Sequence, residues 1–228
     1  MIIVLGARHD PVATALVAAW PAAALCSAED LCAPGWVWPL AGNNAARRWV
    51  VQGCAVADEA LSGVFVARSA VHAAELHRTH PHDRAYLAAE LTAFVTLLLS
   101  STSARVSTPV VDGAFGDATL RPERWMPLAA RCGLTPSPPR LRDATSALTP
   151  TWQAWPVDVV ARECFGPGLK RLATPRRESA IRLIEALGLA WARLVFDGAS
   201  KLRLIGTLAL PDAPARTALG RVLSGQTA

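Results

Sequence analysis

Three histidines that lie close together are the residues whose type and spacing most directly indicate chemistry. His77 and His80 would share one face of a helix, His82 follows shortly after, and imidazole pairs at such spacing bind zinc or iron. Glu75 or Asp83 would supply a third ligand. This pattern allows a metal-dependent enzyme, and a solvated helix end without any ligand explains the same residues as well.

Two other groups of potentially reactive residues have structural explanations. His9 and Asp10 follow the first apolar run, where α/β proteins bind ligands at strand ends, but Asp10 is equally suited to cap a helix begun by Pro11. The five cysteines are odd in number and include no C-x-x-C pair. This argues against a disulfide framework or a zinc knuckle and favours reduced thiols in a cytoplasmic protein.

Four of the eight tryptophans fall in segments that are predicted as loops: Trp36, Trp38, Trp152 and Trp155. Indole rings in loops often anchor interfaces, because a loop alone buries such a ring poorly. We therefore regard these residues as interface candidates for a protein partner or for self-association. The alternative is that these loops fold back over the core.

The composition excludes several classes of protein. The chain has 228 residues, of which 52% are apolar and 18% charged, so a well-packed core is expected. The formal net charge is +5, but the arginines are scattered without interleaved aromatic residues, so we expect no nucleic-acid partner. No apolar run is long enough to span a membrane, and the apolar run at the N-terminus is too short for a signal peptide. A cytoplasmic protein is the resulting expectation.

The first half of the chain has the pattern of a parallel α/β sheet. Ile2–Leu5 is a predicted strand, a helix begins at Asp10 and Pro11, and Ala23–Cys26 is a second strand, parallel to the first by right-handed crossover geometry. Residues 27–46 are predicted as loop. The further predicted strands are 49–51, 63–67 and 105–108, and the predicted helical segments are 68–82, 83–100 and 121–132.

The second half begins with a break in composition. Residues 134–156 are rich in proline, serine and threonine and are predicted as a linker or irregular loop. A strand at 157–165 and a helix at Thr174–Leu187, ended by Gly188, follow. Two apolar strands then flank the turn D-G-A-S that begins at Asp197, and a last helix spans about 214–223.

Several local motifs, in this order, resemble an ATP-grasp protein preceded by its pre-ATP-grasp domain. Asp83–Tyr86 with Glu90 is similar to a "D-R-x-Y-x-x-x-E" helix, and Arg105–Pro109 to a "V-x-N-x-P" segment. Pro122–Leu134 resembles the helix that leads into the ATP-grasp lobes, and Ala180–Pro211 resembles the last helix and hairpin of the second lobe. The resemblance covers roughly residues 1–140 and 157–225.

The chain departs from this family where the family binds Mg²⁺ and nucleotide. The family's metal-binding "E-x-N-P" falls on Leu208, Leu210 and Pro211, and aliphatic side chains cannot ligate a hard cation. The family's "D-F" carboxylate falls on Val195, and Asp197 lies two residues on, in the turn; Asp212, one residue past Pro211, is a partial substitute for the metal ligands.

The first nucleotide-binding lobe also departs from the family. Only about 40 residues separate Leu134 from Thr174, roughly half of what the first lobe needs to bury a core. Lys170 is the one lysine in that stretch, where the family has a pair of phosphate-binding lysines. Gly166–Gly168 is a turn signal without the lysine that a phosphate cradle needs.

The sequence therefore predicts an α/β fold with a parallel-sheet, pre-ATP-grasp-like domain at 1–135, a proline-rich linker at 136–156, and a reduced α+β ATP-grasp-like lobe at 157–228. The resemblance and its departures imply a catalytically degenerate protein, with ATP and Mg²⁺ binding lost, that acts as a binding or accessory subunit for a ligand, a peptide or a partner enzyme. Two alternatives are a metal-dependent enzyme using the three histidines, and an ATP-dependent carboxylate-amine ligase completed by a partner chain.

Overall fold

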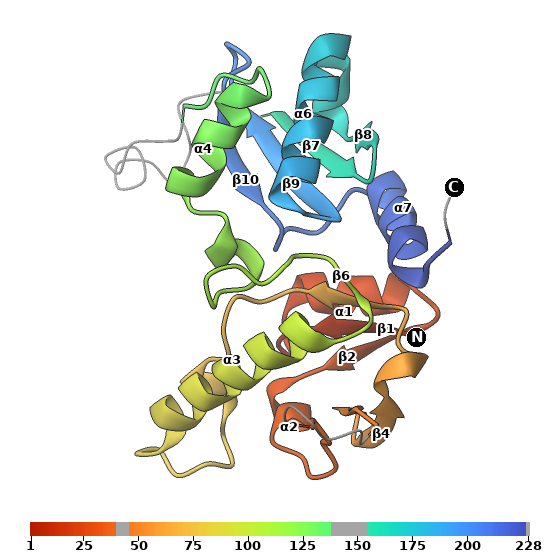
Figure 1. The fold of residues 1–228 in the computed structure, drawn as a ribbon, viewed down its shortest axis with the longest axis vertical. Coiled ribbons are helices and arrows are strands. Elements are labelled where there is room, and N and C mark those ends of the chain that lie inside the picture. The colour runs from red at the N-terminus through yellow and green to blue at the C-terminus, as the bar shows by residue number, and fades with distance from the viewer. Residues whose placement is uncertain (40–45, 138–154, 227–228) are drawn as a thin grey trace. The chain divides into compact units, whose positions relative to one another are not determined.

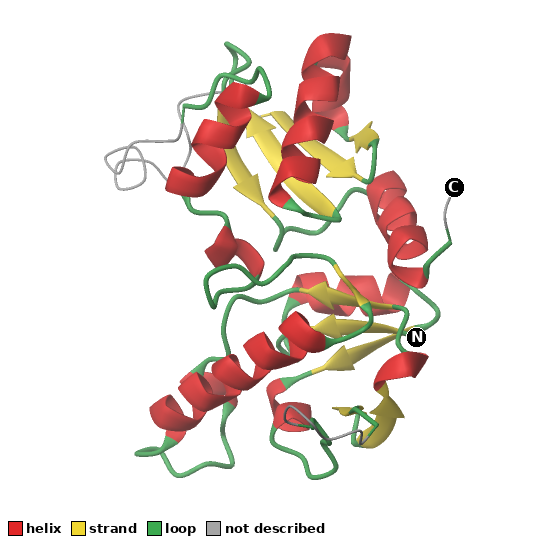
Figure 2. Cartoon of the chain, in the orientation of Figure 1, coloured by secondary structure: helices red, strands yellow, loops and turns green. Residues whose placement is uncertain are grey.

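The computed structural model describes residues 1–39, 46–137 and 155–226. They form two compact units, one comprising Met1–Thr119 with Gly220–Ala228, the other Leu120–Leu219. Figure 1 labels the elements along the chain, and Figure 2 distinguishes helices from strands. The fold is mixed α/β, with a parallel sheet in the first unit and an antiparallel sheet in the second, as the α/β prediction requires.

The first unit is built on a parallel sheet with the strand order β2-β1-β5-β6. Its strands are β1 (Ile2–Leu5), β2 (Ala23–Cys26), β5 (Gly63–Val66) and β6 (Arg105–Val106). From β1 the chain passes to β2 on one side of β1, and it later adds β5 on the other side. The loops after β1 and β5 therefore diverge, which opens a crevice at the carboxyl ends of the strands.

Side-chain alternation along these strands supplies two apolar faces. On one face, Ile3 and Val64 pack in a core cluster with Val95 and Leu98 of α3 (Arg84–Ser101). On the other, the rings of Trp20 and Phe65 meet edge to face at 5.8 Å, beside α1 (Pro11–Ala19). Figure 1 shows α3 and α1 on opposite faces of the sheet.

An antiparallel hairpin of β3 (Arg48–Val51) and β4 (Cys54–Ala57) completes the first unit, together with the short helix α2 (Ala28–Leu31). Only β3 of these was predicted. The turn between the two strands has positive φ at Gln52 and Gly53, the backbone that a two-residue hairpin turn requires. Asp58, directly after β4, is 1% exposed and accepts hydrogen bonds from the Trp49 indole, Thr102 and Ser103.

The helix predicted at 68–82 is wrong. This segment contains a single 3₁₀ turn at Ala73–Glu75, followed by turns up to the start of α3. Its backbone is fixed instead by side chains: the buried Arg68 guanidinium bonds the Ala70 carbonyl at 2.9 Å, and Glu75 accepts from the His72 amide at 3.0 Å. His77 and His80 therefore do not share a helix face.

The second unit is a four-stranded antiparallel sheet with the order β10-β9-β7-β8. Its strands are β7 (Trp155–Val160), β8 (Glu163–Phe165), β9 (Trp191–Phe196) and β10 (Leu202–Gly206). Helices α4 (Pro122–Arg131) and α6 (Thr174–Leu187) lie side by side on one face of the sheet (Figure 1). Trp125, Leu183 and Phe196 belong to the core cluster between these helices and the sheet.

Two parts of the second unit differ from the sequence-based expectation or extend it. The predicted strand 157–165 is a hairpin, because Ala161 has φ +50° and turns the chain between β7 and β8. Of the predicted linker 136–156, residues 138–154 lie outside the described residues. Ser137 donates its backbone N–H to the Leu202 carbonyl at 2.8 Å, beside β10.

The last helix, α7 (Ala213–Ser224), begins in the second unit and ends in the first. Within the first unit, Arg105 donates to the Val222 carbonyl at 2.9 Å. A Cβ on Gly63 would lie 2.6 Å from the Leu223 carbonyl oxygen, and one on Gly220 would lie 2.7 Å from the Trp20 indole nitrogen. The final turn of α7 is therefore in tight contact with the face of the parallel sheet that carries Trp20.

Candidate functional site

A cleft of about 480 Å³ lies at the carboxyl edge of the parallel sheet, within the first unit. Arg8 and His9 come from the loop after β1, Glu29 from the segment after β2, and Glu75 and His77 from the segment after β5. Two further clefts, of about 400 and 510 Å³, share Glu29 with it. The crevice predicted by the strand order thus carries charged groups of both signs.

Arg68 is buried and holds Glu75, one of the residues that line this cleft. Its side chain is 4% exposed, donates to the Ala70 carbonyl, approaches the Gly6 carbonyl at 3.5 Å and forms an ion pair with Glu75. The Glu75 carboxylate also accepts from the His72 amide through the same oxygen that meets Arg68. Glu75, which is 18% exposed, is therefore held in place with its second oxygen outside these bonds.

Carboxylates of the chain itself occupy the two helix N-termini at this edge. Asp10 accepts from the Val12 amide at 2.9 Å at the start of α1, which confirms its predicted role as a helix cap. Asp30 accepts from the Ser27 amide and hydroxyl and from the Gly53 amide. The Val12, Ser27 and Gly53 N–H groups are thus already bonded to carboxylates of the chain, and a phosphate beside them would meet negative charge.

Arg8 and Glu29 form the outer wall of the cleft as a surface ion pair. The Arg8 Nη1 to Glu29 Oε2 distance is 3.1 Å, and the two side chains are 65% and 44% exposed. Ion pairs this exposed contribute about 0–1 kcal/mol, so either partner can be recruited by a ligand at little cost.

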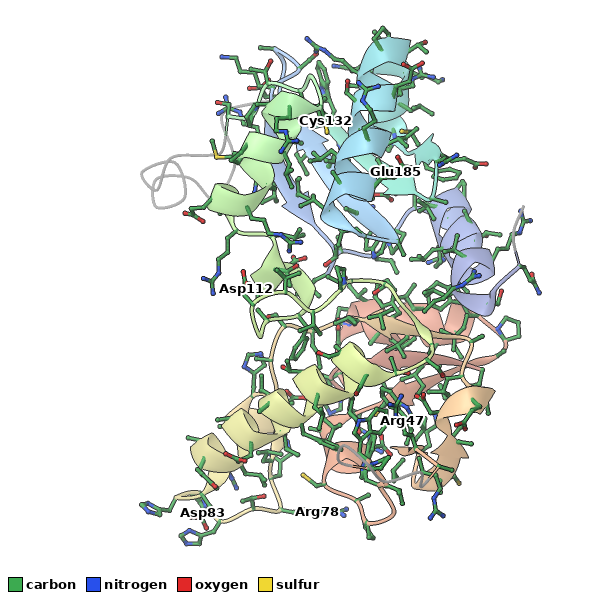
Figure 3. All side chains as sticks on the ribbon, viewed as in Figure 1. Arg47, Arg78, Asp83, Asp112, Cys132 and Glu185 are labelled. Atoms are coloured by element: carbon green, nitrogen blue, oxygen red, sulfur yellow. The ribbon has the colours of Figure 1, made fainter. Side chains whose placement is uncertain are left out.

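The three histidines do not form a metal centre. Within the described ranges, no group of three or more His, Cys, Asp or Glu side chains is arranged to hold a metal ion. His77 lines the cleft, whereas His80 accepts a long 3.4 Å contact from the exposed His82 amide. Figure 3 labels Arg78 and Asp83 on the same loop, which leads to the start of α3.

The cysteines are all free thiols, which agrees with the prediction that they form no disulfide framework. Cys26 is buried at the end of β2, and burial with a smaller contribution from Asp30 raises its pKa far above the usual range. Burial likewise raises the pKa of Cys32 and of Cys164. Thiols with raised pKa values hold little thiolate and are poor nucleophiles.

In the second unit, Asp197 has a structural role in the turn between β9 and β10. Its Oδ1 accepts from the Ala199 and Lys201 amides at 3.0 and 2.8 Å, and its Oδ2 accepts from Arg203 at 2.7 Å. Burial raises the pKa of Asp197, but these hydrogen bonds and the Arg203 charge outweigh it and hold the pKa below its usual range. Both oxygens are thus engaged within the turn.

Asp212 and its neighbours form an ion network on the face of the sheet opposite α4 and α6. The Arg193 guanidinium binds Asp158 in a bidentate manner at 2.7 and 2.8 Å and reaches Asp212 at 3.4 Å. Asp158 is 1% exposed and also accepts the Asp212 amide at 2.7 Å. The preceding Leu208 and Leu210 are half-buried. Asp212 is therefore already paired with a cationic group of the protein itself, the Arg193 guanidinium.

The glycines of the Gly166–Gly168 turn serve close packing. A Cβ on Gly168 would meet the Pro156 carbonyl oxygen at 2.7 Å, and one on Gly166, which has φ +100°, would meet the Asp212 carboxylate at 2.8 Å. Both glycines are thus explained by close packing of the turn against Pro156 and Asp212. Lys170, in the 3₁₀ turn that follows, is exposed.

The tryptophans that were predicted as interface candidates have different environments. Trp36 and Trp38 are half-buried against Trp49, with centroid distances of 5.7 and 5.8 Å, and their indole N–H groups bond the Asp30 carbonyl and Ser101. Trp155 is half-buried in β7 under the Arg171 guanidinium, and Trp152 lies outside the described residues. Their role at an interface stays a prediction.

Comparisons with known proteins give likeness in structure alone. No family model matches the chain, and no curated protein matches it in sequence. Across the described residues, none of the helices combines the length and the apolar character needed to cross a membrane.

Several solved structures match the chain along almost its whole length. Macrocyclase MdnC from Microcystis aeruginosa MRC, bound with precursor peptide MdnA, has a TM-score of 0.69 at 10% identity, covering 98% of this chain and 99% of MdnC. A RiPP-associated ATP-grasp ligase of Chryseobacterium gregarium, in complex with ADP and a leader and core peptide, has a TM-score of 0.66 at 8% identity, covering 100% and 97%. ATP-grasp ligase PsnB with a minimal precursor has a TM-score of 0.65 at 11% identity, covering 99% of each chain. The chain therefore has an ATP-grasp-like fold.

Proposed function

We propose that this protein is an ATP-grasp-like binding protein that recognises a peptide and has lost the use of Mg·ATP. The fold supports the first part, because MdnC, PsnB and the Chryseobacterium ligase all carry this fold and were solved with precursor or leader peptides. A peptide-binding accessory subunit keeps the scaffold of such a ligase and has no need of its phosphoryl chemistry.

The observation that carries the proposal is the end of β10, where the resemblance aligns the family's metal ligands with Leu208 and Leu210. Mg²⁺ prefers oxygen ligands and loses its hydration shell reluctantly. Half-buried leucines offer no such ligand and make the position apolar.

The nearby carboxylates are poor replacements. Asp197 uses both oxygens to close the turn, and Asp212 faces the guanidinium of Arg193. Bringing either to a divalent cation would break contacts that stabilise the hairpin or the start of α7.

Isothermal titration with Mg·ATP tests the loss of nucleotide binding directly. We expect no binding tighter than about 100 μM, corresponding to roughly −5.5 kcal/mol. PsnB, solved with Mg and ADP, serves as the positive control under the same conditions. Binding of Mg·ATP tighter than about 100 μM would overturn the proposed loss.

Peptide recognition is tested separately by fluorescence anisotropy with labelled peptides encoded beside the gene of this protein. We expect at least one to bind with Kd below about 10 μM, and the same affinity with and without Mg·ATP. A peptide that binds only in the presence of Mg·ATP would indicate a working ligase.

The two alternatives receive less support. The metal-dependent enzyme lacks a suitable ligand set in the described part of the chain. A ligase completed by a partner chain is weakened by the likeness to MdnC, which extends over 99% of the MdnC chain and leaves no large part of it unmatched. An ATP-consumption assay on material purified with any tightly bound partner would distinguish this last alternative from the proposed function.

A further inference from the structure

We propose that the cleft at the carboxyl edge of the parallel sheet binds a free α-amino acid. This site lies in the first unit, and the proposal does not rest on the peptide binding proposed above. The groups that matter are the cleft side chains that can still bind a ligand in addition to their contacts within the protein. They are the Glu75 carboxylate, the Arg8–Glu29 pair, and the imidazoles of His9 and His77.

A phosphate ligand is disfavoured by the placement of acidic groups. Asp10 occupies the N-terminus of α1, and Asp30 accepts the backbone and side-chain donors at the start of α2. A bound phosphate would face these carboxylates at the start of both helices and would be repelled by them. The same reasoning disfavours nucleotides, whose phosphates need such donors.

A zwitterion matches the groups that are left. Glu75, whose Oε1 is bonded to Arg68 and to the His72 amide, lines the cleft together with Glu29, so the two carboxylates offer acceptors for a ligand ammonium group. Arg8 supplies a guanidinium suited to a ligand carboxylate.

When a zwitterion binds, the exposed Arg8–Glu29 ion pair opens. Arg8 then contacts the ligand carboxylate, and Glu29 contacts the ligand ammonium group. Because an ion pair this exposed contributes about 0–1 kcal/mol, opening it costs little compared with two new charge-assisted contacts inside the cleft. A ligand that carries only an amine, or only a carboxylate, would make one of these charge-assisted contacts in place of both. This is the reason to expect selectivity for the zwitterion.

The size and lining of the cleft fit the same class of ligand. Its volume of about 480 Å³ falls in the range of small-molecule sites. Ala7, Ala28 and Ala74 contribute short apolar side chains to the lining, so space is left for the side chain of the amino acid.

The experiment is isothermal titration of the full chain with each proteinogenic amino acid in turn. We expect at least one to bind with Kd between about 10 μM and 1 mM. Its N-acetyl derivative, which lacks the ammonium group, and its amide, which lacks the carboxylate, should bind at least tenfold more weakly. Inorganic phosphate should not compete.

Two variants connect this binding to the cleft. Arg8→Gln and Glu29→Gln should each weaken binding at least tenfold while circular dichroism and thermal midpoint stay unchanged, since both side chains are exposed. The matched controls are Arg162→Gln and Glu185→Gln, which remove a similarly exposed pair with a 3.0 Å contact in the second unit and should bind as the wild type does.

The proposal is overturned if no amino acid binds with a Kd below about 1 mM, if inorganic phosphate competes, if the N-acetyl or amide derivative binds as tightly as the free amino acid, or if the Arg8 and Glu29 variants retain wild-type affinity. None of these outcomes bears on Mg·ATP binding, so the two proposals can fail separately.

Discussion

Asp58 is a buried carboxylate that, within the part of the chain that the structure describes, is held by hydrogen bonds and forms no ion pair. Its two oxygens accept from the Trp49 indole at 2.7 Å, the Thr102 hydroxyl at 2.6 Å, and the Ser103 amide and hydroxyl at 3.0 and 2.9 Å. It thereby ties the end of the β3–β4 hairpin to the end of α3. Burial alone raises the pKa of Asp58, but the four hydrogen bonds outweigh burial and lower the pKa below its usual range.

Replacing Asp58 by Asn should destabilise the first unit by about 2–3 kcal/mol, because an amide nitrogen would face the donors of Ser103. The change is measured as the shift of the urea unfolding transition followed by tryptophan fluorescence. Glu59→Gln, at the exposed neighbouring position, is the control and should stay within about 0.5 kcal/mol of the wild type. Equal effects at the two positions would contradict this role of Asp58.

The lowered pKa also predicts a pH dependence. Asp58 binds its proton less readily in the folded than in the unfolded state, so its contribution to stability is present above the unfolded pKa of about 3.9 and is lost as pH falls through the folded pKa. The free energy of unfolding of the wild type should therefore fall more steeply below about pH 4 than that of Asp58→Asn. Parallel curves for the two proteins would rule out this contribution.

At the scale of elements, the β7–β8 hairpin carries local strain at its turn. Ala161 is exposed and has φ +50°, a conformation that a residue with a Cβ adopts at a cost of about 1–2 kcal/mol. Ala161→Gly should raise the free energy of unfolding by about 0.5–1 kcal/mol, after allowing for the larger entropy of glycine in the unfolded chain.

Thermal midpoints of the second unit measure this change. Ala161→Val is the matched variant and should lower the midpoint, since a β-branched side chain disfavours positive φ still more. If glycine and valine shift the midpoint in the same direction, the turn is not strained in this way.

Elements with strong local signals were predictable from the sequence. The cap at Asp10, the proline at the start of α1 and the apolar runs on either side define the β-α-β opening, and α6 spans Thr174–Leu187 as predicted. The β7–β8 turn was missed because Ala161 and Arg162 are not typical turn residues. The segment after β5 was wrongly predicted as a helix. Its conformation is held in part by the contact of Arg68 with Gly6, and a contact between residues so far apart in the sequence leaves no local signal.

The candidate site was predictable only in fragments. His9, Glu75 and His77 were each identified as residues of interest, but for different reasons and in different groups. The cleft joins them with Arg8 and Glu29 because β1 lies between β2 and β5, and strand order is a property of the whole sheet. The sequence offered one signal for this grouping: each of these residues lies in a segment that follows a predicted strand of the parallel sheet.

At the scale of the whole molecule, the chain divides into two units that do not follow its linear order, because residues from Gly220 onward return to the first unit. The substitution Gly63→Ala tests how much the packing of these returning residues contributes to the stability of the first unit. The added methyl group would lie 2.6 Å from the Leu223 carbonyl oxygen, so either β5 or the last turn of α7 must move.

We expect Gly63→Ala to destabilise the first unit by about 1–3 kcal/mol and to speed proteolysis within 213–226. The measurements are the thermal midpoint and limited trypsin digestion followed by mass spectrometry. Gly198→Ala is the control, because a Cβ there meets no atom within 4 Å. A Gly63→Ala protein as stable and as protease-resistant as this control would contradict the tight packing of α7.

The closing role of α7 has a consequence for how the protein is made. A nascent chain can form the parallel strands early, yet the sheet face around Gly63 and Trp20 stays uncovered until the codons for Val222 and Leu223 have been translated and those residues have left the ribosomal exit tunnel. Until then an apolar patch is open to chaperones and to neighbouring nascent chains. Completion of the parallel-sheet unit thus waits for a helix that is synthesised after most of the second unit.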